Sequence, residues 1–266
     1  MTNMKASYVA RWLAGLVKNT YPEDRLYLEL GPDVAVKGIL VCWMANAGAR
    51  RTALERRANL IIAHESPYYT TPNFDSGCPH PDTWQVNVAI KKFYAENRIV
   101  FIQSHRTLDN FCIPRLFGEH LGFPPPVIHQ GYKGYEFTLV YDLLPIPFAE
   151  LVANLKKRMK LSRVRTSLGK PNKIIRRVGL GWGGVSLSSN LQYMELLLQN
   201  RVEVVIGGEV DEYAMEYYRE SSMEWIELGH YASEIIGLEK ATQVIARQFP
   251  GIPVSCYYDP GKIIFY

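Results

Sequence analysis

Short apolar runs alternate with amphipathic stretches through the first half of the chain. Runs rich in Ile, Leu, Val, Phe and Trp have the length of buried strands, and they fall at residues 38–43, 59–63 and 99–103. Stretches with helical spacing of apolar residues lie at 6–18, 47–58, 83–97 and 108–121. This strand–helix alternation predicts an α/β fold with a mostly parallel sheet covered by helices.

A proline-rich segment at residues 122–131 interrupts the pattern, because three consecutive prolines cannot lie inside a helix or a central strand. A second α/β unit follows. Strands are expected at 135–141, 174–180, 202–206 and 225–228, and the chain closes with segments 254–258 and 263–266 around a hairpin-like turn at 259–261. Helices are expected at 148–161, 190–199, from 211, and at 233–248. We therefore predict one domain over residues 1–125 and another over 126–266, with the option that the C-terminal segment packs back on the first.

Three of the apolar runs end in histidine with a carboxylate close behind. The segments are ANLIIAHE, RIVFIQSHRTLD and MEWIELGHYASE, and the residues are His64, Glu65, His105, Asp109, His230 and Glu234. In open α/β sheets, ligands gather beyond the carboxyl ends of the strands. The four-residue spacing in the second and third segments places histidine and carboxylate on one face if each segment begins a helix.

Imidazole and carboxylate together suit Zn, Mn, Fe, Co or Ni better than Ca or Mg. Two such ions sharing a carboxylate could activate water and stabilise a developing oxyanion. Each histidine taken singly is explained as well by a hydrogen-bonded core or surface residue. The three together predict a metal site.

The same segments resemble the YbgI-type dinuclear-metal-centre proteins, also called Ngg-one-interacting-factor-three-like proteins or GTP cyclohydrolase type 2 homologues. That family carries I-I-x-H-H-P, H-T-x-x-D and G-H-Y-x-[ST]-E elements, and this chain has LIIAHESP, SHRTLDN and GHYASE in the same order. Its G-G-x-G turn is similar to GLGWGGVS, and its T-G-D element to IGGEV. The resemblance runs in patches over residues 37–266.

The resemblance implies two linked three-layer α/β domains with mixed, mostly parallel sheets and a metal cleft between them. It implies two divalent transition-metal ions held by His64, Asp109, His230 and Glu234, with His105 lining the site. It also implies a homo-oligomer, a hexameric ring whose sites face the interior.

This chain departs from the family pattern at several positions. Glu65 replaces the second histidine of H-H; a carboxylate can still coordinate, so Glu65 stays in the expected ligand set, but its harder character leaves the metal's identity open. Arg106 stands where the family has Thr, and it could hold an anionic substrate or point to solvent. Glu209 replaces the acid of T-G-D. These changes predict a divergent branch.

Composition and charge narrow the class of protein. The 266 residues are 47% hydrophobic and 21% charged, which is typical of a globular chain, and no apolar run approaches the roughly 18 residues of a membrane span. The N-terminus reads as an amphipathic helix rather than a signal peptide. Four cysteines without a C-x-x-C pair indicate a reduced, cytoplasmic protein.

The positive charge is concentrated in one segment. Residues 156–177 hold ten basic residues and no acid, so the remainder has 20 basic against 26 acidic residues, a net charge of −6. This basic segment could bind a phosphate-bearing ligand or nucleic acid, or it could be a solvated helix face followed by an exposed loop.

Two further stretches leave alternatives open. The aromatic loop at 66–81 could be a lid over the site, with His80 as an extra ligand, or a surface or oligomer-contacting loop. GLGWGG could cradle a phosphate, but it fits neither G-x-G-x-x-G nor a P-loop, so a tight structural turn is the better explanation. No G-x-S-x-G elbow is present, and a serine hydrolase is discounted.

Our leading hypothesis is a metal-dependent hydrolase-like protein in which a dinuclear centre activates water. The expected metal ligands are His64, Glu65, Asp109, His230 and Glu234, with His105 as an auxiliary ligand or proton shuttle. The substrate class is expected to be a nucleotide or another phosphorylated heterocycle. The alternative is a ring-forming scaffold, with a structural metal site and a protein or nucleic-acid partner.

Overall fold

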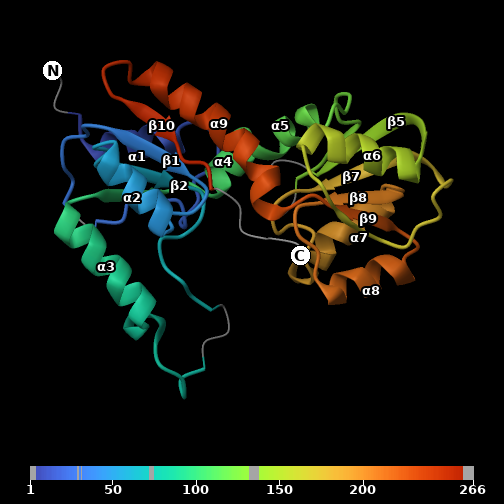
Figure 1. Ribbon diagram of the computed structural model, residues 1–266, viewed down its shortest axis with the longest axis horizontal. Helices are drawn as coiled ribbons and strands as arrows, with labels where there is room; N and C mark the ends of the chain where they lie inside the picture. The colour runs from blue at the N-terminus through green and yellow to red at the C-terminus, as the bar shows by residue number, and fades with distance from the viewer. Residues whose placement is uncertain (1–3, 29, 31, 72–74, 132–137, 260–266) are drawn as a thin grey trace. The chain divides into compact units, whose positions relative to one another are not determined.

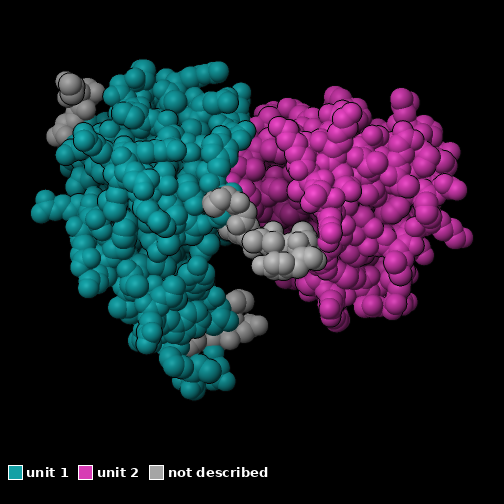
Figure 2. All heavy atoms as spheres, viewed as in Figure 1, with its two compact units in different colours: residues 1–111, 238–266 teal, residues 112–237 magenta. Residues whose placement is uncertain are grey.

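The chain divides into two compact units. The computed structural model describes residues 4–28, 30, 32–71, 75–131 and 138–259. Unit 1 comprises residues 1–111 and 238–266, and unit 2 comprises residues 112–237 (Figure 2). The domain boundary expected between residues 125 and 126 stays a prediction.

Unit 1 is built on a four-stranded parallel sheet in the order β10-β1-β2-β3 (Figure 1). The strands are β1 (Ile39–Cys42), β2 (Leu60–Ala63), β3 (Val100–Gln103) and β10 (Val254–Cys256). The C-terminal strand thus pairs with the first strand, with Ile39 opposite Val254. Every residue of β1, β2 and β3 is buried, so both faces of the sheet are covered.

One face of this sheet carries a cluster of apolar side chains. Leu40, Ile61 and Phe101 project from three adjacent strands into it. The small residues Ala49 and Ala53 let a helix approach closely, and Ile90 and Tyr94 fill the remaining volume.

The helices of unit 1 are α1 (Ala6–Ala14), α2 (Ala47–Glu55), α3 (Gln85–Asn97) and α4 (Arg106–Phe111), with a 3-10 turn, η1 (Pro81–Thr83), before α3. Helix α2 begins at an Asn46 cap, whose side chain accepts from the Ala49 amide. Helix α9 (His230–Gln248) begins in unit 2 and ends in unit 1.

The single helix predicted over residues 108–121 is wrong, because the chain forms two helices there, α4 and then α5 (Ile113–His120). Cys112 separates them with φ −153°, outside the helical region. Pro114, in the first turn of α5, has no amide to continue the preceding helix.

Unit 2 contains a six-stranded mixed sheet in the order β4-β5-β7-β8-β9-β6 (Figure 1). The strands are β4 (Ile128–His129), β5 (Leu139–Pro147), β6 (Arg165–Thr166), β7 (Ile174–Gly181), β8 (Val204–Gly207) and β9 (Glu224–Glu227). The central strands β7, β8 and β9 are parallel, whereas β4, β5 and β6 pair antiparallel at the margins.

Helices α6 (Phe148–Met159), α7 (Leu191–Gln199) and α8 (Glu212–Glu220), with the 3-10 turn η2 (Ser188–Asn190), complete this unit. Helix α6 buries Phe148, Leu151 and Leu155, and its last turn carries basic residues, as its amphipathic spacing predicts. Tyr193 of α7 donates a hydrogen bond to the carbonyl of Leu180 on β7.

The predicted fold class is confirmed: the chain is α/β with mixed, mostly parallel sheets. The closing segment at 263–266, most of the predicted turn at 259–261 and residues 135–137 of a predicted strand lie outside the described residues. Among the described helices, none combines the length and apolar character needed to cross a membrane.

Candidate metal centre

Each of the three predicted histidines lies within three residues of the carboxyl end of a strand. His64 comes after β2 and His105 lies two residues beyond β3. In the parallel register of these strands, Ala63 is opposite Gln103, so the two histidines emerge at the same edge of the sheet of unit 1. His230 follows β9 after two residues and begins α9 in unit 2.

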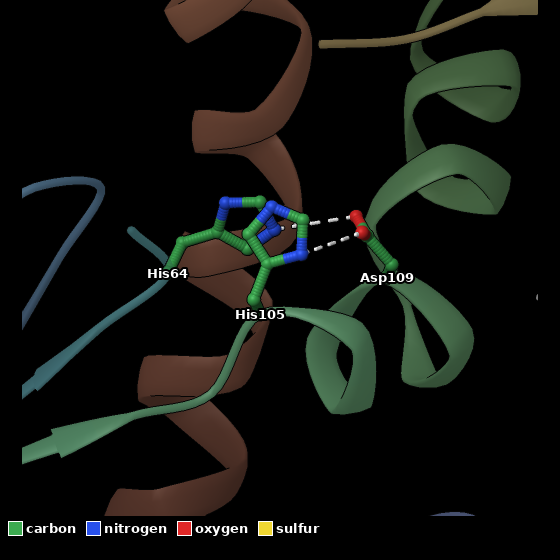
Figure 3. A group of neighbouring side chains, drawn as sticks. All are labelled: His64, His105 and Asp109. Atoms are coloured by element: carbon green, nitrogen blue, oxygen red, sulfur yellow. Dashed lines mark hydrogen bonds and ion pairs between the residues drawn. The ribbon is translucent and has the colours of Figure 1, made fainter. Parts of the chain in front are cut away.

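His64, His105 and Asp109 form a compact group in unit 1 (Figure 3). His64 Nε2 lies 3.3 Å from Asp109 Oδ1, and His105 Nδ1 lies 3.5 Å from Asp109 Oδ2. The two imidazole rings are stacked with their centroids 4.2 Å apart. One ligand atom from each residue lies within 4.8 Å of the other two, so the group could hold a metal ion.

Burial differs across this group. His64 is fully buried and Asp109 is 1% exposed, whereas the His105 side chain is 30% exposed. Glu65 is also accessible, at 28%, with Oε1 3.4 Å from His64 Nδ1 and 3.8 Å from His105 Nε2. A buried imidazole–carboxylate pair with accessible donors beside it is the arrangement of a site with an open side.

Asp24 fixes the position of His105 and the start of α4. Its Oδ1 accepts from the amides of His105 (2.8 Å) and Arg106 (3.2 Å), and its Oδ2 accepts from the amide of Thr107 (2.7 Å). These are amides that the first turn of a helix leaves without intrahelical partners. Asp24 therefore supports both His105 and the helix that carries Asp109.

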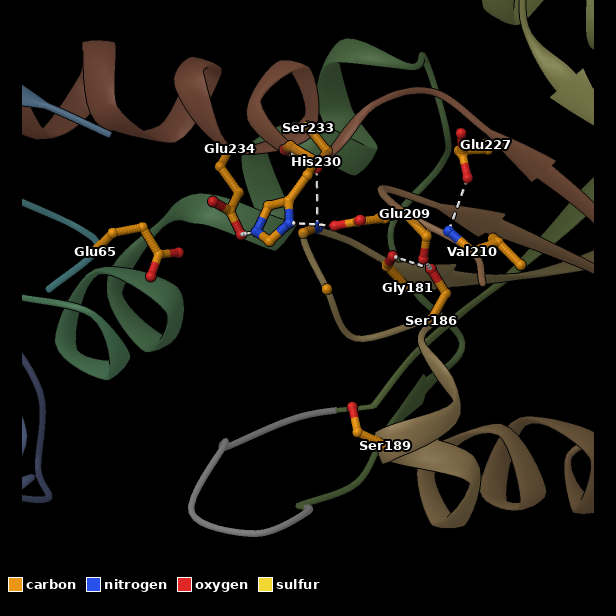
Figure 4. Close-up of polar contacts among 12 residues, drawn as sticks. Glu65, Gly181, Ser186, Ser189, Glu209, Val210, Glu227, His230, Ser233 and Glu234 are labelled. Carbon is orange, nitrogen blue, oxygen red and sulfur yellow. Dashed lines mark hydrogen bonds and ion pairs between the residues drawn. The ribbon is translucent and has the colours of Figure 1, made fainter. Parts of the chain in front are cut away.

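A second group of donors lies in unit 2 (Figure 4). His230 Nε2 is 3.4 Å from Glu234 Oε1, one helical turn along α9. On the other side of the ring, Nδ1 is 2.9 Å from Glu209 Oε2. Glu234 is buried and His230 is partly exposed.

The glycine-rich turn after β7 lies against this second group. Gly183 has φ +52°, and its amide donates to Ser233 Oγ at 2.9 Å. A Cβ atom at Gly183 would overlap the Glu234 carboxylate and come within 3.2 Å of His230 Nε2. The turn thus makes room for the histidine and glutamate of GHYASE, a packing role close to the tight turn expected from the sequence.

Three other features considered in the sequence have structural contacts outside these two groups of donors: His80, Arg106 and the aromatic loop. His80 caps the 3-10 turn η1 and lies 3.6 Å from Asp82, so it is not among the grouped donors. Arg106 Nε lies 2.5 Å from Glu23 Oε1, which engages the guanidinium with a carboxylate of its own unit. Asn87 holds the described part of the aromatic loop to α3 through the backbone of Tyr69 and Pro81.

The basic segment is partly neutralised within unit 2. Arg177 forms a two-pronged ion pair with Asp142, and Arg165 forms another with Glu227. Lys173 lies 3.1 Å from Glu224. Three of the ten basic residues thus form ion pairs within unit 2, and for the others the sequence leaves both ligand binding and a solvated surface as explanations.

Comparison with known proteins gives the family. Residues 24–258 match the family model described as Duf34/NIF3 (NGG1p interacting factor 3). The chain belongs to this family. The resemblance identified from the three motifs is thereby confirmed.

Relatives of this NIF3-family chain cover most of its length. A "GTP cyclohydrolase 1 type 2 homolog" of Chlamydia pneumoniae is 24% identical over 231 residues, which are 84% of this chain and 85% of the relative. A Bacillus cereus protein related to NIF3 superposes with a TM-score of 0.77 at 11% identity, over 100% of both chains. The Staphylococcus aureus protein SA1388 gives 0.74 at 16% identity, over 98% of this chain and 100% of that chain. At these identities the solved structures show the shared fold.

Sequence reasoning missed Asp24, because it lies 81 residues before His105 and carries no local motif. It also assigned no role to Ser233, although a serine at the third position after His230 is a visible feature of GHYASE. Glu209 was noted only as part of the IGGEV element.

Proposed function

We propose that this NIF3-family chain is a metal-dependent hydrolase-like protein with a dinuclear metal centre that activates water. The observation that carries the proposal is the buried His64–Asp109 pair with His105 stacked beside it. A neutral imidazole and a carboxylate in a buried position are ligands that divalent transition metals prefer. The name of the Chlamydia pneumoniae relative, a GTP cyclohydrolase 1 type 2 homolog, supports a nucleotide or another phosphorylated heterocycle as the substrate class.

The proposed ligands are His64, Glu65, Asp109, His230 and Glu234. The two ions would be drawn from Zn, Mn, Fe, Co and Ni. When bound, such ions would lower the pKa of water and neutralise charge that develops on the substrate.

The burial of each residue indicates the role for which its side chain is suited. His64 and Asp109 are buried and held by one another, so they suit ligands whose geometry stays fixed. Glu65 and His105 reach solvent, so they can meet a substrate. His105 suits the transfer of a proton to a leaving group, because Asp109 orients one ring nitrogen and the other lies on the accessible side toward Glu65.

We also propose that the chain assembles as a homohexameric ring, as the resemblance of its motifs to this family implies. Light scattering coupled to size-exclusion chromatography measures the assembly directly. A monomeric mass at micromolar concentration would refute the ring.

Metal content and turnover test the function together. The full chain, purified and loaded with Zn²⁺ or Mn²⁺, is expected to retain two ions per chain by inductively coupled plasma mass spectrometry. It is then expected to hydrolyse a member of a panel of nucleotides and phosphate esters, and to lose that activity with a chelator. His64→Ala is expected to lower the metal content and to remove the activity.

His80→Ala is the matched control, because it removes an exposed imidazole of the same unit without touching the group. Its metal content and turnover are expected to equal those of the wild type. Bound metal without turnover of any panel member would favour the scaffold alternative, and a chain that retains no metal would refute the proposal.

A further inference from the structure

His230 lies between two carboxylates of unit 2 that face different ring nitrogens. Glu234 faces Nε2 at 3.4 Å, and Glu209 faces Nδ1 at 2.9 Å (Figure 4). Only the Glu209 contact is within ordinary hydrogen-bond distance for a ring N–H and a carboxylate. An ionised carboxylate can only accept, so the contact with Glu209 favours a ring in which Nδ1 carries a proton.

Hydrogen bonds hold both polar atoms of the peptide group that joins Glu209 to Val210. Ser186, which is fully buried, has its Oγ 2.8 Å from the Glu209 carbonyl oxygen. The amide of the next residue, Val210, donates to Glu227 Oε2 at 2.7 Å, and Glu227 is itself held by Arg165. These contacts hold in place the backbone from which the Glu209 carboxylate reaches the ring.

A neutral imidazole has one N–H and one lone pair. With the proton on Nδ1, the lone pair is on Nε2, which is the nitrogen beside Glu234. A histidine that ligates a metal commonly donates its other N–H to a carboxylate, which sets the tautomer and ring orientation. The Glu209–His230–Glu234 arrangement has this form.

Gly183 and Gly208 add an independent packing constraint. The Gly183 backbone lies against the His230–Glu234 pair, and a Cβ at Gly208 would overlap the backbone of Gly183. Gly208 immediately precedes Glu209. The close approach of the Gly208 and Gly183 backbones therefore also brings Glu209 near the His230 ring.

We infer that Glu209 is a positioning residue that fixes His230 with Nε2 toward Glu234 and so raises the affinity of this pair for a divalent transition-metal ion. This inference rests on the proposed function for its metal, and it assigns a role to a residue outside the expected ligand set.

Isothermal titration of the full chain with ZnCl₂ tests the effect on affinity. Glu209→Ala removes the acceptor and is expected to weaken binding about 10- to 100-fold, the usual cost of losing such a partner. Glu209→Gln keeps a carbonyl acceptor without the charge and is expected to give a smaller loss. Glu220→Gln removes an exposed carboxylate at the end of α8 and is expected to bind as the wild type does.

Long-range ¹H–¹⁵N spectra of metal-free protein give a readout that a merely structural role would not move. At a pH where imidazole is neutral, His230 is expected to carry its proton on Nδ1 in the wild type and in Glu209→Gln. Glu209→Ala is expected to shift protons to Nε2 while the urea unfolding midpoint stays unchanged.

Unchanged affinity and an unchanged tautomer in Glu209→Ala would overturn the inference. If the wild type binds no Zn²⁺, the proposed function fails, and the tautomer of His230 still decides whether Glu209 positions the ring.

Discussion

Replacing Asp24 by alanine tests how far a residue remote in sequence supports the candidate centre. The substitution leaves three amides without their acceptor, those of His105, Arg106 and Thr107. Loss of an aspartate cap costs roughly 0.5–2 kcal/mol of stability. The upper end applies here, because Thr107 is 2% exposed and water cannot readily replace the lost bond at its amide.

We therefore expect Asp24→Ala to lower the free energy of unfolding by about 2 kcal/mol. With a urea m-value of about 2–3 kcal/mol/M, the unfolding midpoint would fall by roughly 0.7–1 M. Asp24→Asn keeps one acceptor oxygen and is expected to lose about 1 kcal/mol. The assay is urea unfolding followed by far-ultraviolet circular dichroism.

A second readout connects this cap to the metal group. Because Asp24 holds the start of α4, its loss also loosens His105 and Asp109, and we expect Zn²⁺ affinity to fall about 10-fold. Glu55→Ala is the control, since Glu55 is an exposed residue at the end of α2. The reasoning is refuted if Asp24→Ala unfolds within about 0.5 kcal/mol of the wild type and binds Zn²⁺ equally well.

Three further predictions follow from the same geometry. Gly183→Ala is expected to abolish most Zn²⁺ binding by the His230–Glu234 pair, because the new Cβ overlaps the Glu234 carboxylate and the residue has φ +52°. Gly251→Ala is the control, since no heavy atom lies within 4 Å of its added Cβ. Equal Zn²⁺ titration curves for the two variants would contradict the packing argument. Chelation is expected to lower stability by about 2.7 kcal/mol for each ion removed, relative to protein at a metal concentration 100 times the Kd of that ion, measured as a thermal midpoint. His64→Ala removes one ligand but keeps the His230–Glu234 pair, so the difference made by the chelator should become smaller than in the wild type. Asp211→Ala is expected to cost about 1 kcal/mol at neutral pH, because Asp211 caps α8 through the Ala214 amide and also accepts from Ser188. Burial raises the pKa of Asp211, but its hydrogen bonds from Ala214 and Ser188 outweigh this and hold the pKa below its ordinary 3.8, so the contribution is present above that value and is lost as the pH falls further. A destabilisation by Asp211→Ala that persists at full size in acid would show that the charged form is not what matters.

The order and type of most elements could be predicted from the sequence. Buried strands such as β2 and β3 are short apolar runs, and α6 is an amphipathic stretch, so local composition and spacing identify them. The break between α4 and α5 was missed, although Pro114 was visible, because a proline in the first turn of a new helix looks like one inside a longer helix.

The candidate site was only partly accessible to sequence reasoning. The motifs identified His64, His105 and Asp109 as donors, because each follows an apolar run at a recognisable spacing. Their distances depend on β2 and β3 being adjacent and parallel, with Ala63 opposite Gln103. No pattern in the sequence predicts the register between β2 and β3.

The sequence by itself determined the donors, the strand–helix rhythm and the family motifs, because these depend on residues close together along the chain. Only the tertiary structure decided that Asp24 caps α4, that Glu209 faces Nδ1 of His230, and that Gly183 packs against Glu234. Each of these contacts joins residues at least 21 positions apart. Such contacts are set by strand order and close packing, which are properties of the whole folded unit and leave no local signal in the order of the amino acids.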